Sequence, residues 1–328
     1  MIPTLAADSA LEQCLRSLEA QTLREFEVII VDNSGQRLAG RAEGASAARI
    51  IENDRNVGFG AAINQGLHAS HAPFLATLND DAAAHPGWLA SLTRAMAAAP
   101  RVGMCASQVR LASEGLLDSA GMLICADGSS KQRGHLQPPE DYVRAGDVLL
   151  PSACAALYRR TMLENVGGFD EDFFLYCEDT DLGLRARWAG WNCVYVPEAV
   201  VDHRYSHSAG RASPLKAYYV ERNRLFLVVK NFPAGALTRV PFVSLARYFW
   251  HFAAIVQGRG AAARFRAEGN SGWRLLLFVL RAHLAVLGSW SSLWKKRRAI
   301  RGTAEIDPGE FCRLLRQHSI TPRQVAAL

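Results

Sequence analysis

Apolar and polar positions follow two alternating patterns over the first two-thirds of the chain. Short apolar runs over residues 26–31, 73–78, 102–109 and 193–196 predict buried strands, and the first two end at Asp32 and at Asn79. Between the runs, residues 9–21, 60–70 and 87–99 have helical spacing. This alternation predicts an α/β fold with a mostly parallel sheet flanked by helices, in which ligands bind at the carboxyl ends of the strands.

The last third of the chain is rich in aromatic residues, leucine and arginine. Residues 240–257 and 273–294 are each nearly as long as the roughly 20 apolar residues that cross a bilayer, but both contain arginine and histidine. In the first stretch, Arg247 and His251 share one helical face, and apolar side chains lie largely opposite. We expect amphipathic helices that lie in a membrane interface, followed by a basic run at 295–298. The alternative is an ordinary helical subdomain with a solvated charged face.

Length and composition allow one large domain with an appendage. The chain has 328 residues, of which 49% are hydrophobic and 21% charged. We expect a catalytic domain over residues 1–232 and a helical, membrane-associating region over 233–328. The net charge of +6 suits phosphate-bearing ligands or an anionic membrane face.

Three classes of feature are not expected. The seven cysteines are dispersed without a Cys-x-x-Cys pair, which argues against a disulfide framework and a structural zinc site. The N-terminus lacks the basic and apolar segments of a signal peptide. No basic strip is interleaved with stacking aromatic residues, so nucleic acid is not an expected partner.

Acidic residues follow two of the predicted strands. Asp80 and Asp81 at the end of a buried strand would repel each other, and a divalent cation would relieve the repulsion. Their oxygens suit Mg²⁺ or Mn²⁺, with a substrate diphosphate at the remaining positions. Asp32 could accept hydrogen bonds from a ribose or a pyrimidine N–H. The alternatives are a solvated acidic turn at 80–81 and an Asx turn at Asp32.

Two further segments could contact a ligand. Asn56, Gly58 and Asn64 lie in a loop and the helix that it leads into, where the backbone can approach a ligand closely and the helix start favours phosphate. Glu178 and Asp179 stand at a predicted helix start, where one could act as a general base. A simple helix start and carboxylate capping are the respective alternatives.

A histidine cluster follows the predicted strand at 193–196. His203 could complete a metal site or contact a diphosphate, with His207, Arg204 and Arg211 nearby. The alternative for His203 is a structural role.

The order of these motifs is more specific than any one of them. The motifs resemble those of the family 2 glycosyltransferases of the GT-A fold, and within that family the bacterial rhamnosyltransferases that build cell-surface polysaccharide. The resemblance covers roughly residues 1–300. The family motifs are Ile-Pro-Thr at 2–4, Leu-Glu-Ala-Gln-Thr at 18–22, Val-Asp-Asn-Ser at 31–34, Asn-Val-Gly-Phe-Gly at 56–60, Leu-Asn-Asp-Asp-Ala at 78–82, Gly-Gly-Phe-Asp-Glu at 167–171 and Glu-Asp-Thr-Asp-Leu at 178–182. Lys-Ala-Tyr-Tyr-Val-Glu-Arg-Asn at 216–223 and the hydrophobic tail resemble the rhamnosyltransferase branch.

The resemblance implies roles for individual residues. Pro3, Thr4 and Asp32 would line the base and ribose of the nucleotide. Asn79, Asp80 and Asp81 would correspond to the Asp-x-Asp metal motif of the family, with Asp81 as the metal contact and His203 as the second protein contact to the metal. Asp179 would be the catalytic base, and Glu178 would contact the acceptor. Only Met1 and Ile2 precede Pro3, so the first strand is either short or incomplete.

The expected function follows from the resemblance. The chain would be an inverting glycosyltransferase that moves rhamnose from dTDP-rhamnose to a lipid-linked or other saccharide acceptor, with Mg²⁺ or Mn²⁺. It would act as a peripheral protein on the cytoplasmic face of the cell membrane. A UDP-sugar donor and a non-catalytic nucleotide-sugar-binding protein are the alternatives.

Overall fold

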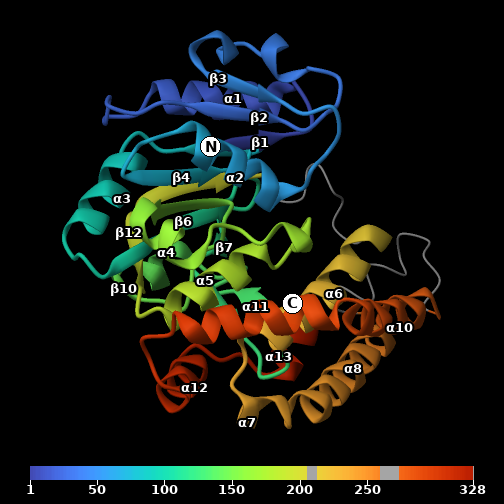
Figure 1. Cartoon of the computed structure of the whole chain (residues 1–328). Helices are drawn as coiled ribbons and strands as arrows, with labels where there is room; N and C mark the ends of the chain where they lie inside the picture. The colour runs from blue at the N-terminus through green and yellow to red at the C-terminus, as the bar shows by residue number, and fades with distance from the viewer. Residues whose placement is uncertain (205–212, 259–272, 328) are drawn as a thin grey trace. The chain divides into compact units, whose positions relative to one another are not determined.

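The computed structural model describes residues 1–204, 213–258 and 273–327, which form two compact units (Figure 1). The first unit contains Met1–Met122 and the described residues from Gln132 to Arg204. The second contains Leu123–Lys131 and the described residues from Ser213 onward. His207 and Arg211, which the sequence analysis placed near His203, lie outside the described residues.

The first unit alternates strands and helices. Its elements are β1 (Ile2–Thr4), α1 (Ser9–Glu19), β2 (Ile29–Asp32), η1 (Ala39–Arg41), η2 (Ala45–Ala47), β3 (Arg49–Glu52), α2 (Phe59–Ala69), β4 (Phe74–Leu78), β5 (Ala82–Ala84), α3 (Trp88–Ala97), β6 (Val102–Leu111), β7 (Leu117–Ser119), η3 (Pro139–Tyr142), β10 (Gly146–Asp147), β11 (Ala155–Arg159), α4 (Arg160–Val166), η4 (Glu171–Phe173), α5 (Glu178–Trp188) and β12 (Asn192–His203).

The strands form two sheets. β1, β2 and β3 pair in parallel in that order. The larger sheet has the order β10-β12-β6-β11-β4, with β5 on β12 and β7 on β6. Its β6–β12 pair is parallel, whereas β11 runs antiparallel to both β4 and β6. The backbone N–H of Leu78 donates to the carbonyl of Met1, which links β4 to β1.

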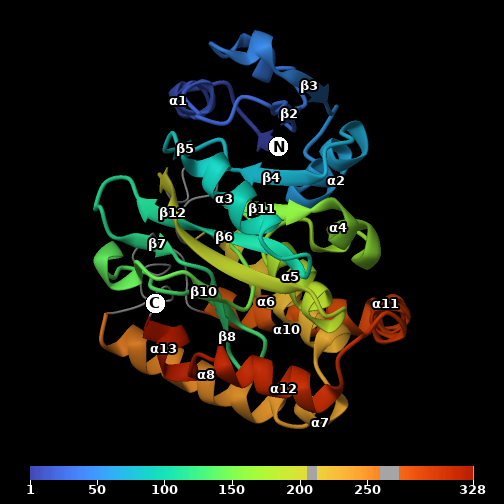
Figure 2. The same ribbon diagram turned by 90° about the vertical axis from the view of Figure 1, so that its left-hand side faces the viewer.

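Two apolar clusters cover the faces of the larger sheet. One holds Leu11 of α1 and Trp88 of α3 with Cys105 of β6, and the other holds Leu163 of α4 and Leu182 of α5 with Met104 of β6. Successive side chains of a strand point to opposite faces, so β6 contributes to both clusters. The predicted α/β fold with a central sheet flanked by helices is therefore confirmed, with mixed rather than mostly parallel pairing (Figure 2).

The second unit is mainly helical. It contains most of a hairpin formed by β8 (Met122–Ile124) and β9 (Ser130–Gln132), followed by α6 (Pro214–Asn231), α7 (Ala234–Leu237), α8 (Val240–Val256), α10 (Trp273–Gly288), α11 (Trp290–Gly302), α12 (Pro308–Gln317) and α13 (Pro322–Ala327). Helix α6 packs against α10 and α11, and α8 packs against α13.

The two amphipathic stretches of the sequence are helical, but the second is broken. α10 and α11 are separated at Ser289 by a bend of 69°. No single helix of the described residues is long and apolar enough to cross a membrane, although α10 and α11 together meet the length and composition of a broken span. The expected division of function, with catalysis in 1–232 and membrane association in 233–328, stays a prediction.

Candidate functional site

The carboxyl ends of β1 and β4 bring two of the predicted ligand-binding residues into contact. The Thr4 hydroxyl donates a hydrogen bond to Oδ2 of Asp80 at 2.7 Å. Pro3, beside Thr4, is held in the sheet opposite Val31 of β2. Burial raises the pKa of Asp80 to about 6, and the neighbouring charge of Asp81 adds to this rise. An unbalanced carboxylate at this strand end favours a cationic ligand.

A buried row of three side chains lies beside this pair. The β5–β12 pairing aligns Ala82 with His203, which places His203 Nε2 3.2 Å from Oδ1 of Asp81. On the other side of the ring, His203 Nδ1 lies 2.8 Å from Oδ2 of Asp118. If Nδ1 donates its proton to Asp118, the lone pair of Nε2 faces the Asp81 carboxylate. Two acceptors at this distance require a proton or a cation between them.

Asp118 was not among the residues predicted from the sequence. It is buried in β7, where β7 pairs with β6 and β6 pairs with β12. The only signal in the sequence was an aspartate within an apolar environment, because the partner histidine lies 85 residues further along the chain.

Asp32 uses both of its oxygens within its own loop. Oδ1 accepts a hydrogen bond from the Ser34 N–H at 2.8 Å, and Oδ2 accepts one from the Ala39 N–H at 2.7 Å. The Asx-turn interpretation therefore holds for this side chain. A carboxylate has about four acceptor positions, so a contact with a ribose or a base remains compatible with these bonds.

The glycine-containing loop before α2 packs against the loop before α5. Asn56 closes an Asx turn by accepting from the Gly58 N–H at 2.9 Å. Gly58 has a φ of 93°, and a Cβ at this position would lie 2.4 Å from the carbonyl oxygen of Phe174. Asn64 exchanges two 2.9 Å hydrogen bonds with the backbone of Phe169. Asn56 and Asn64 thus hold the 167–174 segment, and their predicted contacts with a nucleotide sugar stay predictions.

Glu178 and Asp179 begin α5 after a strained loop. Phe174, Tyr176 and Cys177 have φ angles of 59°, 68° and 65°, which side-chain-bearing residues rarely adopt. Such strain persists only where surrounding structure holds it, and it is concentrated at functional sites. The strained loop therefore supports a functional role for the two carboxyls that follow it.

The two carboxyls differ in their surroundings. Asp179 accepts hydrogen bonds from the N–H groups of Ala153 and Thr180 and is partly exposed. Glu178 is buried, and its Oε2 has no hydrogen-bond partner among the described residues. Burial, followed by the charge of Asp179, raises the pKa of Glu178 to about 8, and burial also raises the pKa of Asp179. The hydrogen bonds favour Asp179 as the ionised member and Glu178 as the protonated one.

We expect Glu178→Gln to stabilise the protein at alkaline pH. The unfolded glutamic acid loses its proton near its ordinary pKa, whereas folded Glu178 keeps it up to about pH 8. Stability is therefore lost as the pH rises between these values, and a neutral glutamine escapes this loss. The gain is on the order of 2 kcal/mol at about pH 9 and near zero at about pH 4. Thermal unfolding across this range measures it, with exposed Glu140→Gln as the control. Equal gains at both pH values would contradict the assignment.

The acidic pairs at 80–81 and 178–179 share one edge of the larger sheet. Asn79 N–H donates to the carbonyl of Cys154 at 2.8 Å, and the adjacent Ala153 N–H donates to Asp179. β4 and β11 are antiparallel, with Leu78 aligned with Ala155, so the end of β4 meets the start of β11. Residues a hundred positions apart in the sequence are thereby linked through one backbone–backbone hydrogen bond and one hydrogen bond from the backbone to the Asp179 side chain.

The family model described as Glycosyl transferase family 2 matches residues 1–167, just over half of the chain. The chain belongs to glycosyl transferase family 2. This family 2 member is thus a glycosyltransferase, and its relatives include rhamnosyltransferases.

Two curated relatives are rhamnosyltransferases by name. N-acetylglucosaminyl-diphospho-decaprenol L-rhamnosyltransferase of Mycobacterium tuberculosis H37Rv is 31% identical over 242 residues, which cover 64% of this glycosyltransferase and 77% of the relative. Rhamnosyltransferase WbbL of Escherichia coli K12 is 42% identical over 62 residues, which cover 19% of this chain and 23% of the relative.

Solved structures share the fold at low sequence identity. GalNAc-T7, solved with UDP, GalNAc and Mn²⁺, has a TM-score of 0.60 and 14% identity, and the match covers 75% of this chain and 50% of that one. The mannosyltransferase PcManGT of Pyrobaculum calidifontis, solved with GDP-Man and Mn²⁺, has a TM-score of 0.50 and 17% identity, with coverages of 92% and 84%. These likenesses support the glycosyltransferase fold.

The described residues fit a divalent cation that shares its coordination with a substrate. Asp81 and His203 offer an oxygen and a nitrogen at 3.2 Å from each other, and Asp80 adds charge at the same strand end. Within the described residues, no group of three or more His, Cys, Asp or Glu side chains is arranged to hold a metal ion. A cation at this edge would therefore need further ligands from a diphosphate or from water.

Proposed function

We propose that this glycosyltransferase transfers rhamnose from dTDP-rhamnose to a hydroxyl of a lipid-linked saccharide, with inversion at the anomeric carbon. The observation that carries the proposal is the shared sheet edge of the Asp81–His203 pair and the Glu178–Asp179 pair. The name of the mycobacterial relative, a rhamnosyltransferase acting on a diphospho-decaprenol, supports the sugar and the acceptor class. A UDP-sugar is the nearest alternative donor.

At the donor end, Asp81 and His203 would hold Mg²⁺ or Mn²⁺. When bound, the cation neutralises charge on the leaving nucleotide diphosphate. Thr4 and Asp80, joined by their 2.7 Å hydrogen bond, would line the binding site next to the diphosphate. Pro3 in β1 and Asp32 at the end of the paired strand β2 would contact the nucleotide, and Asn79 and Gly58 would lie along the sugar.

At the acceptor end, Asp179 would take the proton from the attacking hydroxyl. Its two N–H donors, from Ala153 and Thr180, favour the ionised form that a general base needs. Glu178 is buried next to it and would contact the acceptor while protonated. A single displacement needs only a base on the acceptor and charge stabilisation on the leaving group, so no nucleophilic side chain is required.

We expect Asp118→Asn to weaken cation binding about 10- to 100-fold, because Asp118 fixes the orientation and tautomer of His203. Electron paramagnetic resonance of Mn²⁺ in the presence of dTDP measures free and bound metal directly, without turnover. The matched comparison is Asp202→Asn, because Asp202 is a partly exposed carboxylate next to His203 in the chain that pairs with His85 instead. Unchanged Mn²⁺ affinity in Asp118→Asn would exclude the positioning role.

The proposal is tested by ligand-induced thermal stabilisation. dTDP-rhamnose, UDP-glucose, UDP-N-acetylglucosamine and GDP-mannose are each added with and without Mn²⁺ or Mg²⁺. A ligand that binds only the folded state raises the midpoint. The largest cation-dependent rise is expected with dTDP-rhamnose. A larger rise with a UDP-sugar would replace the proposed donor, and no rise with any nucleotide sugar would refute the donor site.

The proposed acceptor places the reaction at a membrane. We propose that residues 1–232 carry out the transfer and that residues 233–328 contact the cytoplasmic face of the cell membrane as a peripheral region. The support is the class of acceptor named for the mycobacterial relative, together with the apolar helices of the second unit.

A further inference from the structure

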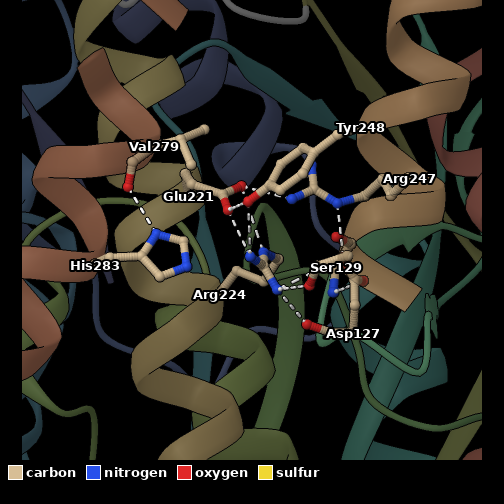
Figure 3. Close-up of polar contacts among 9 residues, drawn as sticks. Asp127, Ser129, Glu221, Arg224, Arg247, Tyr248, Val279 and His283 are labelled. Carbon is tan, nitrogen blue, oxygen red and sulfur yellow. Dashed lines mark hydrogen bonds and ion pairs between the residues drawn. The ribbon is translucent and has the colours of Figure 1, made fainter. Parts of the chain in front are cut away.

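Helix α8 has an inner face that is fixed by a buried charge network (Figure 3). Arg247 donates to Asp127 at 2.6 Å and to Glu221 at 2.7 Å, and Arg224 donates to the Asp127 carbonyl at 2.6 Å. All four side chains are buried, and the two acids balance the two arginines. The sequence alternative of a solvated charged face on this helix is wrong for Arg247, because this face is turned into the second unit.

The opposite face of α8 is apolar and exposed. Its five large exposed apolar side chains lie within roughly 80° of arc on a helix of 3.6 residues per turn, and the stripe is centred opposite Val240, Ser244 and Arg247. These side chains are Phe242, Leu245, Phe249, Phe252 and Val256. The exposed fraction is 74% for Phe242 and 73% for Val256, so these side chains do not belong to the core.

Helix α10 repeats the arrangement. Ala282 is its one buried residue, on the side that packs against α6. The large exposed apolar residues lie within roughly 100° of arc on the other side. They are Trp273, Leu276, Leu277, Leu280, Leu284 and Leu287, and Leu276 is 73% exposed. A helix at a water-facing surface carries polar residues on its outer side, so this stripe requires an apolar environment.

Charge and aromatic residues indicate which environment that is. Residues 233–303 contain twelve lysines and arginines and a single acidic residue. At the start of α11, Trp290 and Trp294 are stacked and exposed, next to the exposed Lys295 and Arg298. Arg281 lies beside the α10 stripe, over the Tyr218 ring of α6 at 5.2 Å. Tryptophan and basic residues bordering an apolar stripe are the pattern of a helix at an anionic lipid surface.

We infer that the exposed stripes of α8 and α10 form a docking surface for an anionic lipid bilayer, with both helices lying in the interface and not crossing it. The inner faces of both helices are already packed within the second unit, which leaves only their outer faces for lipid. The 69° bend between α10 and α11 separates the leucine stripe from the basic turn. The inference rests on the proposed function and extends it, since it names the helices that would bind the bilayer in which a lipid-linked acceptor lies.

Vesicle flotation of the full chain tests the inference. We expect the chain to float with vesicles of equal phosphatidylcholine and phosphatidylglycerol, and to float less with phosphatidylcholine alone. The double variant Leu276→Gln/Leu284→Gln is expected to lower the partition coefficient at least about tenfold, because two leucines no longer gain from leaving water. Lys295→Gln/Arg298→Gln is expected to lower it only for the anionic vesicles.

A matched control removes two exposed apolar side chains elsewhere. Leu136→Gln/Val143→Gln alters exposed residues of the first unit and is expected to float like the wild type. All four leucine and valine positions are exposed, so the thermal midpoints are expected to stay within about 2 °C of the wild type.

Three outcomes would overturn the inference. The full chain could stay with the soluble protein for both vesicle types. It could float but resist extraction at alkaline pH, which would mean that α10 and α11 span the bilayer. It could form a dimer that the leucine variant dissociates, with no vesicle binding, so that a second copy covers the stripe. The flotation experiment contains no nucleotide sugar, so its result is independent of the thermal-stabilisation experiment. If the chain binds vesicles but no nucleotide sugar stabilises it, the proposed function is refuted and the docking surface is not.

Discussion

Asp179→Asn is expected to lower kcat at least about 1,000-fold while donor affinity changes less than about threefold. General base catalysis contributes about 10²- to 10⁴-fold, and an asparagine cannot take the proton of the acceptor hydroxyl. The amide still fills the place of the carboxyl beside Ala153, so the loop and the donor side are expected to remain intact. Transfer is measured by product mass, and donor affinity by titration calorimetry.

The control for this variant is Asp172→Asn, which removes an exposed carboxylate from the loop that precedes α5. It is expected to keep wild-type turnover within about threefold. If Asp179→Asn also turns over at the wild-type rate, Asp179 is not the base. If neither the wild type nor the variant forms product while both bind donor, the chain is a nucleotide-sugar-binding protein without catalysis.

Asp81→Asn is expected to have a comparable effect by a different route. The side chain faces His203 Nε2 at 3.2 Å, where the cation would be held. Loss of the carboxylate charge is expected to lower Mn²⁺-dependent donor affinity at least about 100-fold and kcat/KM at least about 1,000-fold, since both ground-state binding and leaving-group stabilisation depend on this contact. Titration with dTDP-rhamnose at saturating and absent Mn²⁺ measures the first quantity.

Asp202→Asn is the matched control for Asp81→Asn. Asp202 is the residue before His203 in β12, and its carboxylate pairs with His85 at a partly exposed position. Its replacement is expected to leave the Mn²⁺ dependence of donor binding intact. A wild-type Mn²⁺ response in Asp81→Asn would instead place the cation elsewhere.

The sequence predicted the strand ends well because each is marked locally. Asp32 ends β2, and Asn79 and Asp80 follow β4, so a buried apolar run that leads into an acidic residue was enough to find both strand ends. The strand β11 was not predicted, since Ala155–Arg159 has no alternating pattern and is identified only by its pairing with β4 and β6. That strand is what joins the 80–81 and 178–179 pairs.

Contacts between distant residues could not be predicted from local patterns. The Asp118–His203 contact depends on two strand pairings, β7 with β6 and β6 with β12, and nothing near Asp118 in the sequence indicates its partner. The same holds for Arg247, which the helical pattern assigned to a polar face but whose partners, Asp127 and Glu221, come from a hairpin and another helix. The spacing of apolar and polar residues shows which face of a helix is polar. It does not show whether water or an ion pair satisfies the polar groups on that face.

The central claim is tested most directly by a transfer reaction. The full chain is incubated with Mn²⁺, dTDP-rhamnose and N-acetylglucosaminyl-diphospho-polyprenol in anionic vesicles, and the lipid product is analysed by mass spectrometry and nuclear magnetic resonance. The account predicts a product heavier by one deoxyhexose, with an anomeric configuration opposite to that of the donor, and formation of this product at least about 1,000-fold slower with Asp179→Asn. Retained configuration, or transfer at the wild-type rate in Asp179→Asn, would contradict it.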